Sequence, residues 1–310
     1  MDESSSFFDL QINGYAGVDF NCNGLTLESL RSACDKLKQD GVKGILATII
    51  TADIEDMKSR LQRIVELRRE DKQVEQMIYG FHIEGPFINS EPGFRGAHPP
   101  EKICPVDTDK MEYLLDAAEG LTRIVTLAPE VDEHFRLTRM LTKNKIIVSA
   151  GHCDPTIGVL RSAIDSGLSM FTHLGNGCPQ SLNRHDNIIQ RVLSLREDLW
   201  ICLIADGIHI PFFALKNYLA MVGHEKSIIV TDAMAAAGAG PGRYTLSNLV
   251  LEVGEDRVVR EPGKPNFAGS AISMKRSKGN LTDVVRIDEV SACKMVFDNP
   301  MKALGVQGEL

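Results

Sequence analysis

Polar residues that can do chemistry follow short apolar runs of this chain, where buried strands are expected to end. Glu84, His152, His173 and Asp232 each stand in such a place. A carboxylate with two imidazoles suits a catalytic metal, because such a site takes about three protein ligands and keeps one position open. We therefore predict that Glu84, His152 and His173 bind a divalent ion. Asp232 is predicted to be the base beside a water that the ion activates.

Other residues near these strand ends are assigned structural roles. His82 lies two residues before Glu84 and so shares its face on an ideal strand. Because three ligands suffice, we favour a structural role for His82 over that of a fourth ligand. Cys153 and Cys178 flank the predicted site, and we interpret both as buried or half-buried thiols.

The elements that must position these residues alternate between strands and helices. Strict alternation implies a parallel sheet, and eight such units fit a closed barrel whose strand ends meet at one mouth. We predict an α/β fold: a (β/α)8 TIM-type barrel of the metal-dependent hydrolase kind. The alternative, an open doubly wound sheet, is disfavoured because no G-x-G-x-x-G follows the first strand. The predicted strands are Phe7–Ile12, Lys43–Ile50, Ile78–Ile83, Arg123–Leu127, Ile146–Ser149, Ser169–Thr172, Trp200–Ile204 and Ser227–Thr231.

Helical patterns lie between most of the strands. The segment Thr26–Asp40 is predicted to be a helix ended by Gly41, and Asp53 is predicted to cap the next one. After the eighth strand, residues 238–269 are expected to form a long loop with a hairpin over the barrel mouth, followed by helix to Gly305. No linker or repeat divides the chain, so residues 1–310 are predicted to be a single domain.

The composition excludes several classes of protein. The 310 residues carry a formal net charge of −8, unlike the basic surface of a nucleic-acid-binding domain. The seven cysteines are scattered, odd in number and without a CxxC pair, as in a cytoplasmic protein with reduced thiols. We see no signal peptide at the acidic N-terminus and no apolar run long enough for a membrane span.

Eight segments of the chain together resemble the N-acetylglucosamine-6-phosphate deacetylase family of the amidohydrolase superfamily. The segments stand in the order and spacing of that family and cover nearly the whole predicted barrel. The resemblance implies hydrolysis of the acetamide of N-acetylglucosamine 6-phosphate to glucosamine 6-phosphate and acetate. The segments are residues 7–21, 80–101, 125–130, 148–156, 171–179, 204–212, 230–240 and 267–274.

The resemblance also implies a role for individual residues. Glu84, His152 and His173 match the family's metal ligands, and Asp232 matches its catalytic aspartate. His98 matches a histidine that helps to polarise the acetyl carbonyl. Arg184 and His209 match residues that hold the sugar phosphate, the arginine coming from the neighbouring subunit of a homodimer. The positions that match further parts of the substrate pocket are Ala97, Asn176, Gly177, Phe267, Ala268 and Gly269.

The chain departs from the usual pattern at the first strand. Most members of the superfamily carry His-x-His there for a second metal, whereas this chain has Gln11 and Asn13. A neutral amide is a poor ligand for a transition metal, so we predict one divalent ion per chain. Two imidazoles and a carboxylate suit zinc, and iron, manganese or cobalt can occupy the same set.

Three further departures concern the sugar pocket and the extent of the chain. The family's Asn-Ala-Met-Pro is Asn176-Gly177-Cys178-Pro179 here, and its Ala-Pro-Ala-Gly is Ala235-Ala236-Ala237-Gly238. The family's small β-sandwich has no counterpart in this sequence, and we expect oligomerisation to cover the exposed surface. Three alternatives stay open: an amidohydrolase of another acylated sugar or cyclic amide, a phosphosugar-binding barrel without activity, and a metal-free isomerase or aldolase.

Overall fold

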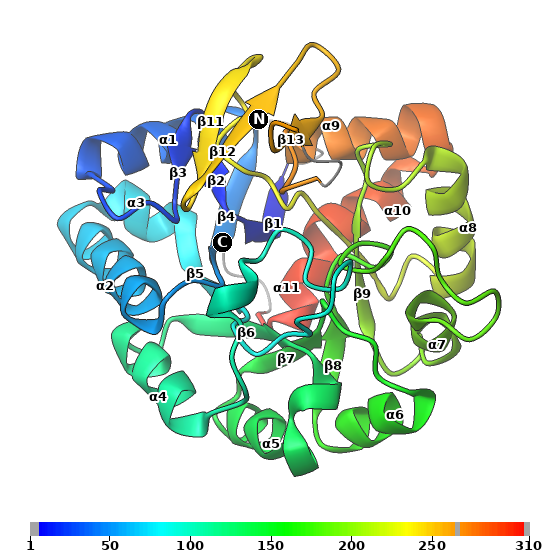
Figure 1. Ribbon diagram of the computed structural model, residues 1–310. Coiled ribbons are helices and arrows are strands. Elements are labelled where there is room, and N and C mark those ends of the chain that lie inside the picture. Colours follow the sequence, from blue (N-terminus) through cyan, green and yellow to red (C-terminus); the bar gives the residue numbers. More distant parts are fainter. Residues whose placement is uncertain (1–5, 264–266, 307–310) are drawn as a thin grey trace.

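Eight parallel strands form a barrel, as Figure 1 shows. The structure, a computed structural model, describes residues 6–263 and 267–306. Each strand lies parallel to its neighbour in chain order, which confirms the predicted TIM-type barrel and places every predicted strand within a few residues. The strands are β1 (Phe7–Ile12), β4 (Val42–Ile50), β5 (Ile78–Glu84), β6 (Thr122–Leu127), β7 (Ile147–Ala150), β8 (Leu168–Phe171), β9 (Trp200–Ile204) and β10 (Ser227–Val230).

The barrel closes between β1 and β10 through a mixture of backbone and side-chain contacts. The Asp232 backbone N–H donates to the Gln11 carbonyl at 3.0 Å, and the Asn13 N–H donates to the Ala233 carbonyl at 2.7 Å. Deeper in the seam, the carboxylate of Asp9 accepts hydrogen bonds at 3.2 Å from the backbone N–H of Thr231 and at 2.5 Å from its hydroxyl. A buried side chain therefore completes the pairing of the first and last strands.

Helices surround the barrel on its outer face (Figure 1). A threonine cap begins the first of them, because the Thr26 hydroxyl accepts the Ser29 N–H at 3.2 Å, and Gly41 follows its end with a φ of 89°. The outer helices are α1 (Leu27–Gln39), α2 (Ile54–Glu70), α3 (Lys72–Met77), α4 (Thr108–Ala117), α5 (Arg136–Lys143), α6 (Ile157–Asp165), α7 (Ile188–Ser194) and α8 (Phe212–Val222). The C-terminal segment forms α9 (Met274–Gly279), α10 (Glu289–Cys293) and α11 (Asn299–Ala303), separated by π-helical turns.

The prediction that the Asp53 side chain caps α2 is wrong. Asp53 does stand at the N-terminal boundary of α2, but its side chain makes no capping hydrogen bond. Its carboxylate instead pairs with the ammonium of Lys102 at 2.8 Å. A charged partner from a distant loop has therefore taken the place of the local backbone donors.

Two apolar layers hold the barrel together. The larger cluster packs the outer faces of the strands against the helices, with Leu61 and Leu114 among its buried members. A second cluster joins inward residues such as Phe8, Leu46 and Met170 to Met301 of α11. Burial of this apolar surface supplies the main driving force of folding and leaves the polar strand ends at the mouth.

A hairpin follows the eighth barrel strand, as predicted. Strands β11 (Gly242–Leu246) and β12 (Leu249–Val253) are antiparallel, and β13 (Val259–Arg260) extends them to a small sheet at the upper edge of Figure 1. Two short strands, β2 (Gly14–Tyr15) and β3 (Val18–Asp19), form a separate pair after β1. None of the helices in the described part of the chain has the length and apolar character that crossing a membrane requires.

Candidate active site

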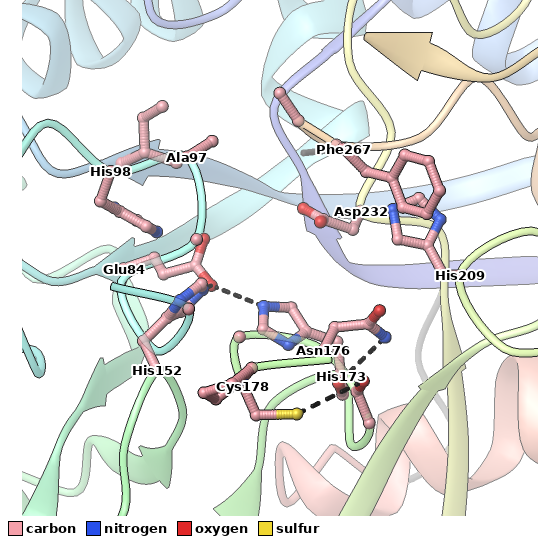
Figure 2. A pocket seen from close by; sticks show the side chains of 18 of the residues that line it. Glu84, Ala97, His98, His152, His173, Asn176, Cys178, His209, Asp232 and Phe267 are labelled. Carbon is pink, nitrogen blue, oxygen red and sulfur yellow. Dashed lines mark hydrogen bonds and ion pairs between the residues drawn. The ribbon is translucent and has the colours of Figure 1, made fainter. Parts of the chain in front are cut away.

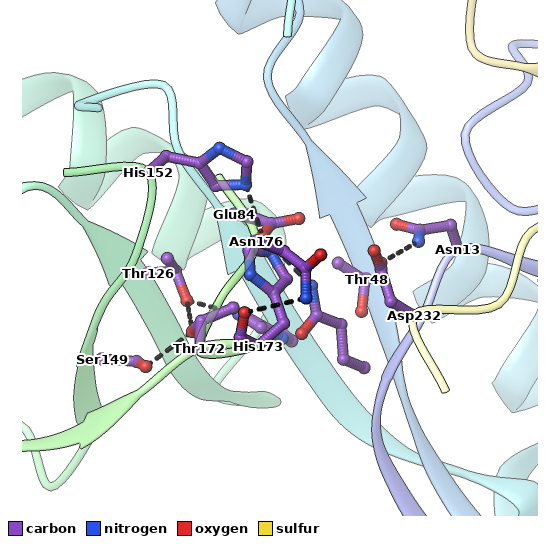
Figure 3. Close-up of polar contacts among 12 residues, drawn as sticks. Asn13, Thr48, Glu84, Thr126, Ser149, His152, Thr172, His173, Asn176 and Asp232 are labelled. Carbon is purple, nitrogen blue, oxygen red and sulfur yellow. Dashed lines mark hydrogen bonds and ion pairs between the residues drawn. The ribbon is translucent and has the colours of Figure 1, made fainter. Parts of the chain in front are cut away.

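The three residues predicted as metal ligands converge at the mouth of the barrel. Glu84 ends β5, and His152 and His173 each follow a strand by two residues. The Oε1 atom of Glu84 lies 3.3 Å from Nε2 of His152 and 3.1 Å from Nε2 of His173. All three side chains are buried and point toward one another in Figures 2 and 3. A carboxylate oxygen and two imidazole nitrogens around one point are the donors expected of a divalent cation site.

The electrostatics of this cluster favour a positive charge at its centre. Burial alone would raise the pKa of Glu84, but hydrogen bonds from the two histidine rings outweigh it and hold that pKa well below its ordinary value. Burial opposes protonation of His173, yet its hydrogen bond to Glu84 raises the pKa of the ring above its ordinary value. Glu84 is thus kept ionised among neighbours that donate to it. A divalent ion fits this donor set because it would replace the proton that the rings now share with the carboxylate.

The His152 ring is fixed from behind. Its Nδ1 donates to the Phe94 carbonyl at 2.8 Å, which leaves Nε2 to face Glu84. Two glycines allow this close packing. A Cβ built on Gly177 would lie 2.8 Å from Nδ1 of His152, and one on Gly96 would lie 3.0 Å from the same ring. The orientation of this predicted ligand therefore depends on the Phe94 carbonyl and on the two glycines, which leave room for the ring.

Four buried polar side chains near the ligand cluster are joined to one another by hydrogen bonds. His82 Nε2 lies 2.7 Å from the Thr126 hydroxyl, which lies 2.7 Å from the Thr172 hydroxyl, which in turn lies 2.6 Å from that of Ser149 (Figure 3). The other ring nitrogen of His82 donates to the Leu10 carbonyl at 3.1 Å. Burial lowers the pKa of His82 to about 4, so the ring is neutral. Both nitrogens of His82 are engaged away from the cluster, in keeping with the structural role that we favoured.

Asp232 lies on the opposite side of the mouth, after β10. Its Oδ1 accepts a hydrogen bond from Nδ2 of Asn13 at 2.7 Å, while Gln11 Nε2 donates to Oε1 of Glu84 at 3.1 Å. Burial raises the pKa of Asp232 to about 6, and the charge of Glu84 adds to the shift. The two amides at the usual positions of a second metal therefore bind the two carboxylates. The sequence indicated that these amides are poor ligands but not that they hold Asp232 and Glu84.

Three site residues have an unusual backbone conformation. His152, His173 and Asp232 have φ angles of 51°, 31° and 48°, in a region that residues other than glycine seldom occupy. Such strain persists where surrounding contacts over-determine it, which is common at functional sites. The sequence did not predict these positive φ angles.

His98 lies close to the predicted ligands. Its ring centroid is 4.4 Å from that of His152, and burial lowers its pKa to about 3, so this ring is neutral. Potential ligand atoms of Glu84, His98 and His152 lie within 4.8 Å of one another. His98 is thus near enough to the cluster to face either a metal ion or a group bound to it. His173 is not in this group of three, but it belongs to the cluster through its own contact with Glu84.

A pocket of about 560 Å³ contains nearly all the predicted site residues. Arg184 does not line it, and instead lies exposed between β8 and α7. No lysine or arginine lines the pocket among the residues that the structure describes. The predicted residues that share the pocket are Glu84, Ala97, His98, His152, His173, Asn176, Gly177, His209, Asp232, Phe267, Ala268 and Gly269.

His209 has a partner that the sequence reasoning missed. Its Nδ1 lies 2.6 Å from Oδ2 of Asp206, and Oδ1 of Asp206 accepts the backbone N–H groups of Ile208 and His209 at 2.8 Å. The ring also packs edge-on against Phe267, with centroids 5.2 Å apart. The close Asp-x-x-His spacing was the signal that could have revealed this pair.

The two cysteines near the site are not part of the ligand cluster. Cys178 lines the pocket, and burial raises its pKa to about 11. Burial also raises the pKa of the fully buried Cys153 well above its ordinary value. Neither thiol belongs to the group of Glu84, His98 and His152 whose potential ligand atoms lie within 4.8 Å of one another.

Comparison with known proteins gives relatives along almost the entire chain. The chain is 31% identical over 301 residues to the N-acetylglucosamine-6-phosphate deacetylase of Bacillus subtilis, covering 96% of this chain and 74% of that protein. It is 35% identical over 298 residues to the N-acetylgalactosamine-6-phosphate deacetylase of a Shewanella species, covering 96% and 72%. No protein-family model matches.

A solved structure gives the same picture in three dimensions. A mutant N-acetyl-D-glucosamine-6-phosphate deacetylase from Mycobacterium smegmatis, in complex with N-acetyl-D-glucosamine-6-phosphate, matches with a TM-score of 0.87 at 28% identity. The match covers 97% of this chain and 77% of that chain. The likeness thus extends over the whole barrel and is not limited to one motif.

Proposed function

The chain belongs to the N-acetylglucosamine-6-phosphate deacetylase family, and from this premise we propose that it hydrolyses N-acetylglucosamine 6-phosphate to glucosamine 6-phosphate and acetate. The observation that carries the proposal is the convergence of Glu84, His152 and His173 opposite the half-buried carboxylate of Asp232 in one pocket. That arrangement has the donor set and the base that hydrolysis of an amide requires.

The proposed cofactor is one divalent ion, held by Glu84, His152 and His173. When bound, such an ion polarises the amide carbonyl and makes a water more acidic. Zinc is the proposed metal, because two imidazoles and a carboxylate are a common zinc donor set. Gln11 and Asn13 are committed to the two carboxylates, which supports a single metal per chain.

Asp232 is proposed to move the proton during the reaction. Asn13 donates to Oδ1, so Oδ2 is the oxygen available to accept the proton of the attacking water. The pKa of about 6 leaves Asp232 ionised at neutral pH, yet near enough to neutrality to pass the proton to the departing amine.

His98 is proposed to stabilise the carbonyl oxygen as negative charge develops on it. The ring is buried and neutral, and its Nδ1 has no hydrogen-bond partner in the part of the chain that the structure describes. A neutral imidazole can present one N–H to an oxyanion, and such donors are most effective in a pocket that excludes water.

The phosphate is proposed to bind at the opposite end of the pocket, near His209. Since the described lining contains no lysine or arginine, the fixed positive charge must come from elsewhere. Arg184 of a second copy in a homodimer is the proposed source, because a guanidinium binds phosphate oxygens through two parallel hydrogen bonds.

Mixed dimers test this arrangement directly. Neither Arg184→Ala nor Asp232→Asn alone should support full activity. In a mixed dimer of the two variants, one site would receive an intact Asp232 from its own chain and an intact Arg184 from its partner. Recovered activity on mixing would support the exchange of arginines, and no recovery would contradict it.

The first test of the reaction itself is release of glucosamine 6-phosphate. Metal-loaded protein is expected to act on N-acetylglucosamine 6-phosphate and to lose activity when a chelator removes the ion. Unphosphorylated N-acetylglucosamine is the matched control. Absence of release in metal-loaded protein, with one metal bound per chain, would contradict the proposed substrate.

One other substrate is supported by a specific observation. The Shewanella relative is an N-acetylgalactosamine-6-phosphate deacetylase, and Gly177 and Cys178 alter the family's pattern at the pocket wall. The galactosamine epimer belongs in the same assay. A higher kcat/KM for that epimer would reassign the sugar while leaving the chemistry unchanged.

Two further predictions remain proposals. We propose that residues 1–310 are one domain, supported by the continuity of the barrel from β1 to β10. We also propose a cytoplasmic location, supported by the seven free cysteines.

A further inference from the structure

A second, smaller cavity adjoins the main pocket. It has a volume of about 120 Å³, and three residues line both spaces: Ile50, Ala97 and Leu246. These three residues therefore form a wall between the cavities. In Figure 2, Ala97 and His98 lie on one side of Glu84, while His209 and Phe267 lie on the other. Ala97, and with it the wall to which it belongs, thus lies across Glu84 from His209.

One short segment at the end of β3 anchors two of the wall residues. The carboxylate of Asp19 accepts the Ser247 N–H at 2.7 Å, directly after Leu246 at the tip of the hairpin. Asn21, two residues further on, accepts the Ile50 N–H through its Oδ1 at 3.0 Å. The Asn21 N–H in turn donates to Asp19 at 2.8 Å. Hairpin tip and strand end are therefore fixed by the same buried group of polar residues.

The third wall residue is held by the loop after β5. Two contacts fix this loop on either side of Ala97: the His98 N–H donates to the Arg95 carbonyl at 3.1 Å, and Lys102 pairs with Asp53 at 2.8 Å. Leu246 and Ile50 are largely buried in one apolar cluster, against which Ala97 packs. Because hydrogen bonds fix the backbone at or next to each wall residue, the wall has little freedom to move aside for a larger group.

We infer that Leu246, together with Ile50 and Ala97, limits the acyl group that the enzyme removes to two carbons. The inference rests on the proposed function, in which the carbonyl carbon lies beside the Glu84–His152–His173 cluster and the sugar lies toward His209. The acyl methyl then faces the opposite, apolar end of the pocket. A longer chain has to displace the wall before it can use the second cavity.

The second cavity also differs from the wall in polarity. Asp53, Asp56, Glu101 and Lys102 contribute to its lining, whereas the wall is apolar. Apolar atoms nevertheless make up most of the lining of this cavity, so an alkyl chain that passed the wall would still be buried there. The limit on acyl length therefore rests on the wall, and removing part of it should let a longer acyl group use this space.

The test compares N-acetyl, N-propanoyl and N-butanoyl glucosamine 6-phosphate as substrates of the metal-loaded wild type and of Leu246→Ala. The expected result is a rise of about tenfold or more in the butanoyl-to-acetyl ratio of kcat/KM, since one methylene in an apolar pocket changes selectivity by ~10–200-fold. A ratio that changes less than about threefold in folded protein would overturn the inference.

Matched controls separate the wall from a general loosening of the site. Leu249→Ala removes the same atoms from a residue that lines only the second cavity, and Leu182→Ala does so in the main pocket alone. Neither control should change the acyl ratio. An equal change in Leu249→Ala would mean that a loosened hairpin, not the wall, sets selectivity. If Leu246→Ala does not fold, Ile50→Val is the milder variant, for which a rise of about threefold or more in the propanoyl-to-acetyl ratio of kcat/KM is expected and an unchanged ratio would overturn the inference.

A binding measurement distinguishes failure of the inference from failure of the proposed function. Titration calorimetry with the same three compounds on Asp232→Asn, with and without Leu246→Ala, reports acyl selectivity without turnover. Selective binding by Asp232→Asn, together with a wild-type protein that hydrolyses none of the compounds, would refute the proposed function alone. Hydrolysis of the acetyl compound with an acyl ratio unaffected by the wall would refute this inference alone.

Discussion

The two ends of the pocket are built in opposite ways. At the cluster end, Glu84, His152 and His173 are buried, and each contacts another member of the site. At the sugar end, Arg184 lies exposed outside the pocket, and the described lining has no lysine or arginine. For the proposed reaction, the difference teaches that one chain supplies all of the proposed groups for the chemistry but no lysine or arginine for the phosphate among the described residues of the pocket. Variants at the two ends should therefore fail in different kinetic parameters.

The largest effect is expected at the cluster end, from Asp232→Asn. An amide cannot accept the proton of the attacking water, so kcat should fall about 10²–10⁴-fold while KM changes little. Metal content, measured by elemental analysis, should stay at the wild-type level because Asp232 is not among the predicted ligands. Near wild-type turnover in this variant would remove Asp232 from the mechanism.

At the sugar end, Arg184→Ala should act on binding. KM for the phosphorylated substrate is expected to rise about 10–100-fold, because one bidentate charged contact is lost, while the rate on an unphosphorylated substrate stays unchanged. Arg161→Ala, which removes an exposed arginine of α6, is the control. An equal loss of kcat/KM on the phosphorylated and the unphosphorylated substrate would contradict a phosphate contact of Arg184. The two ends of the pocket would then not differ in the way proposed.

The packing around His152 offers a finer test of the cluster end. A Cβ on Gly177 would lie 2.8 Å from Nδ1 of His152, so Gly177→Ala should displace the ring and weaken metal binding about tenfold. Gly175 also has a positive φ, of 92°, but a Cβ there would meet its nearest atom at 3.5 Å. Gly175→Ala thus controls for backbone strain. Equal metal affinities of the two variants, measured by competition with a chelator, would contradict the packing argument.

The sequence predicted the barrel and the cluster for the same physical reason. Strands buried on both faces are continuous apolar runs, such as Lys43–Ile50, and their ends are visible as the first polar residues that follow. Glu84, His152 and His173 could therefore be placed on one mouth before any contact was known. The hairpin was visible in the same way, from alternating residues among glycines.

The contacts between distant segments could not be predicted in this way. Asn13 and Asp232 are 219 positions apart, and nothing in either segment shows that they form a hydrogen bond. The wall residue Leu246 is an ordinary hairpin leucine until the fold brings it beside Ile50. The failed Asp53 cap has the same origin, because Lys102 competes for its carboxylate only in the folded chain. Local pattern thus predicts elements and strand ends, while tertiary approach decides the partners of each side chain.

The last prediction concerns stability rather than kinetics, at the seam beneath both ends, where Asp9 joins β1 to β10. Burial raises the pKa of Asp9 from 3.8 to about 7. Between about pH 4 and 7 the folded protein keeps a proton that the unfolded chain has lost, so the free energy of unfolding falls as the pH rises through this window.

In Asp9→Asn, the amide oxygen can still accept the N–H groups of Gln11 and Thr231, and no charge is buried. The variant should therefore exceed the wild type by about 1–4 kcal/mol at pH 8 and lose this advantage near pH 4. Urea unfolding of both proteins across this range measures the difference, in which the other titrating groups cancel. A variant less stable than wild type at pH 8 would mean that the ionised carboxylate, rather than its shape and hydrogen bonds, holds the seam closed.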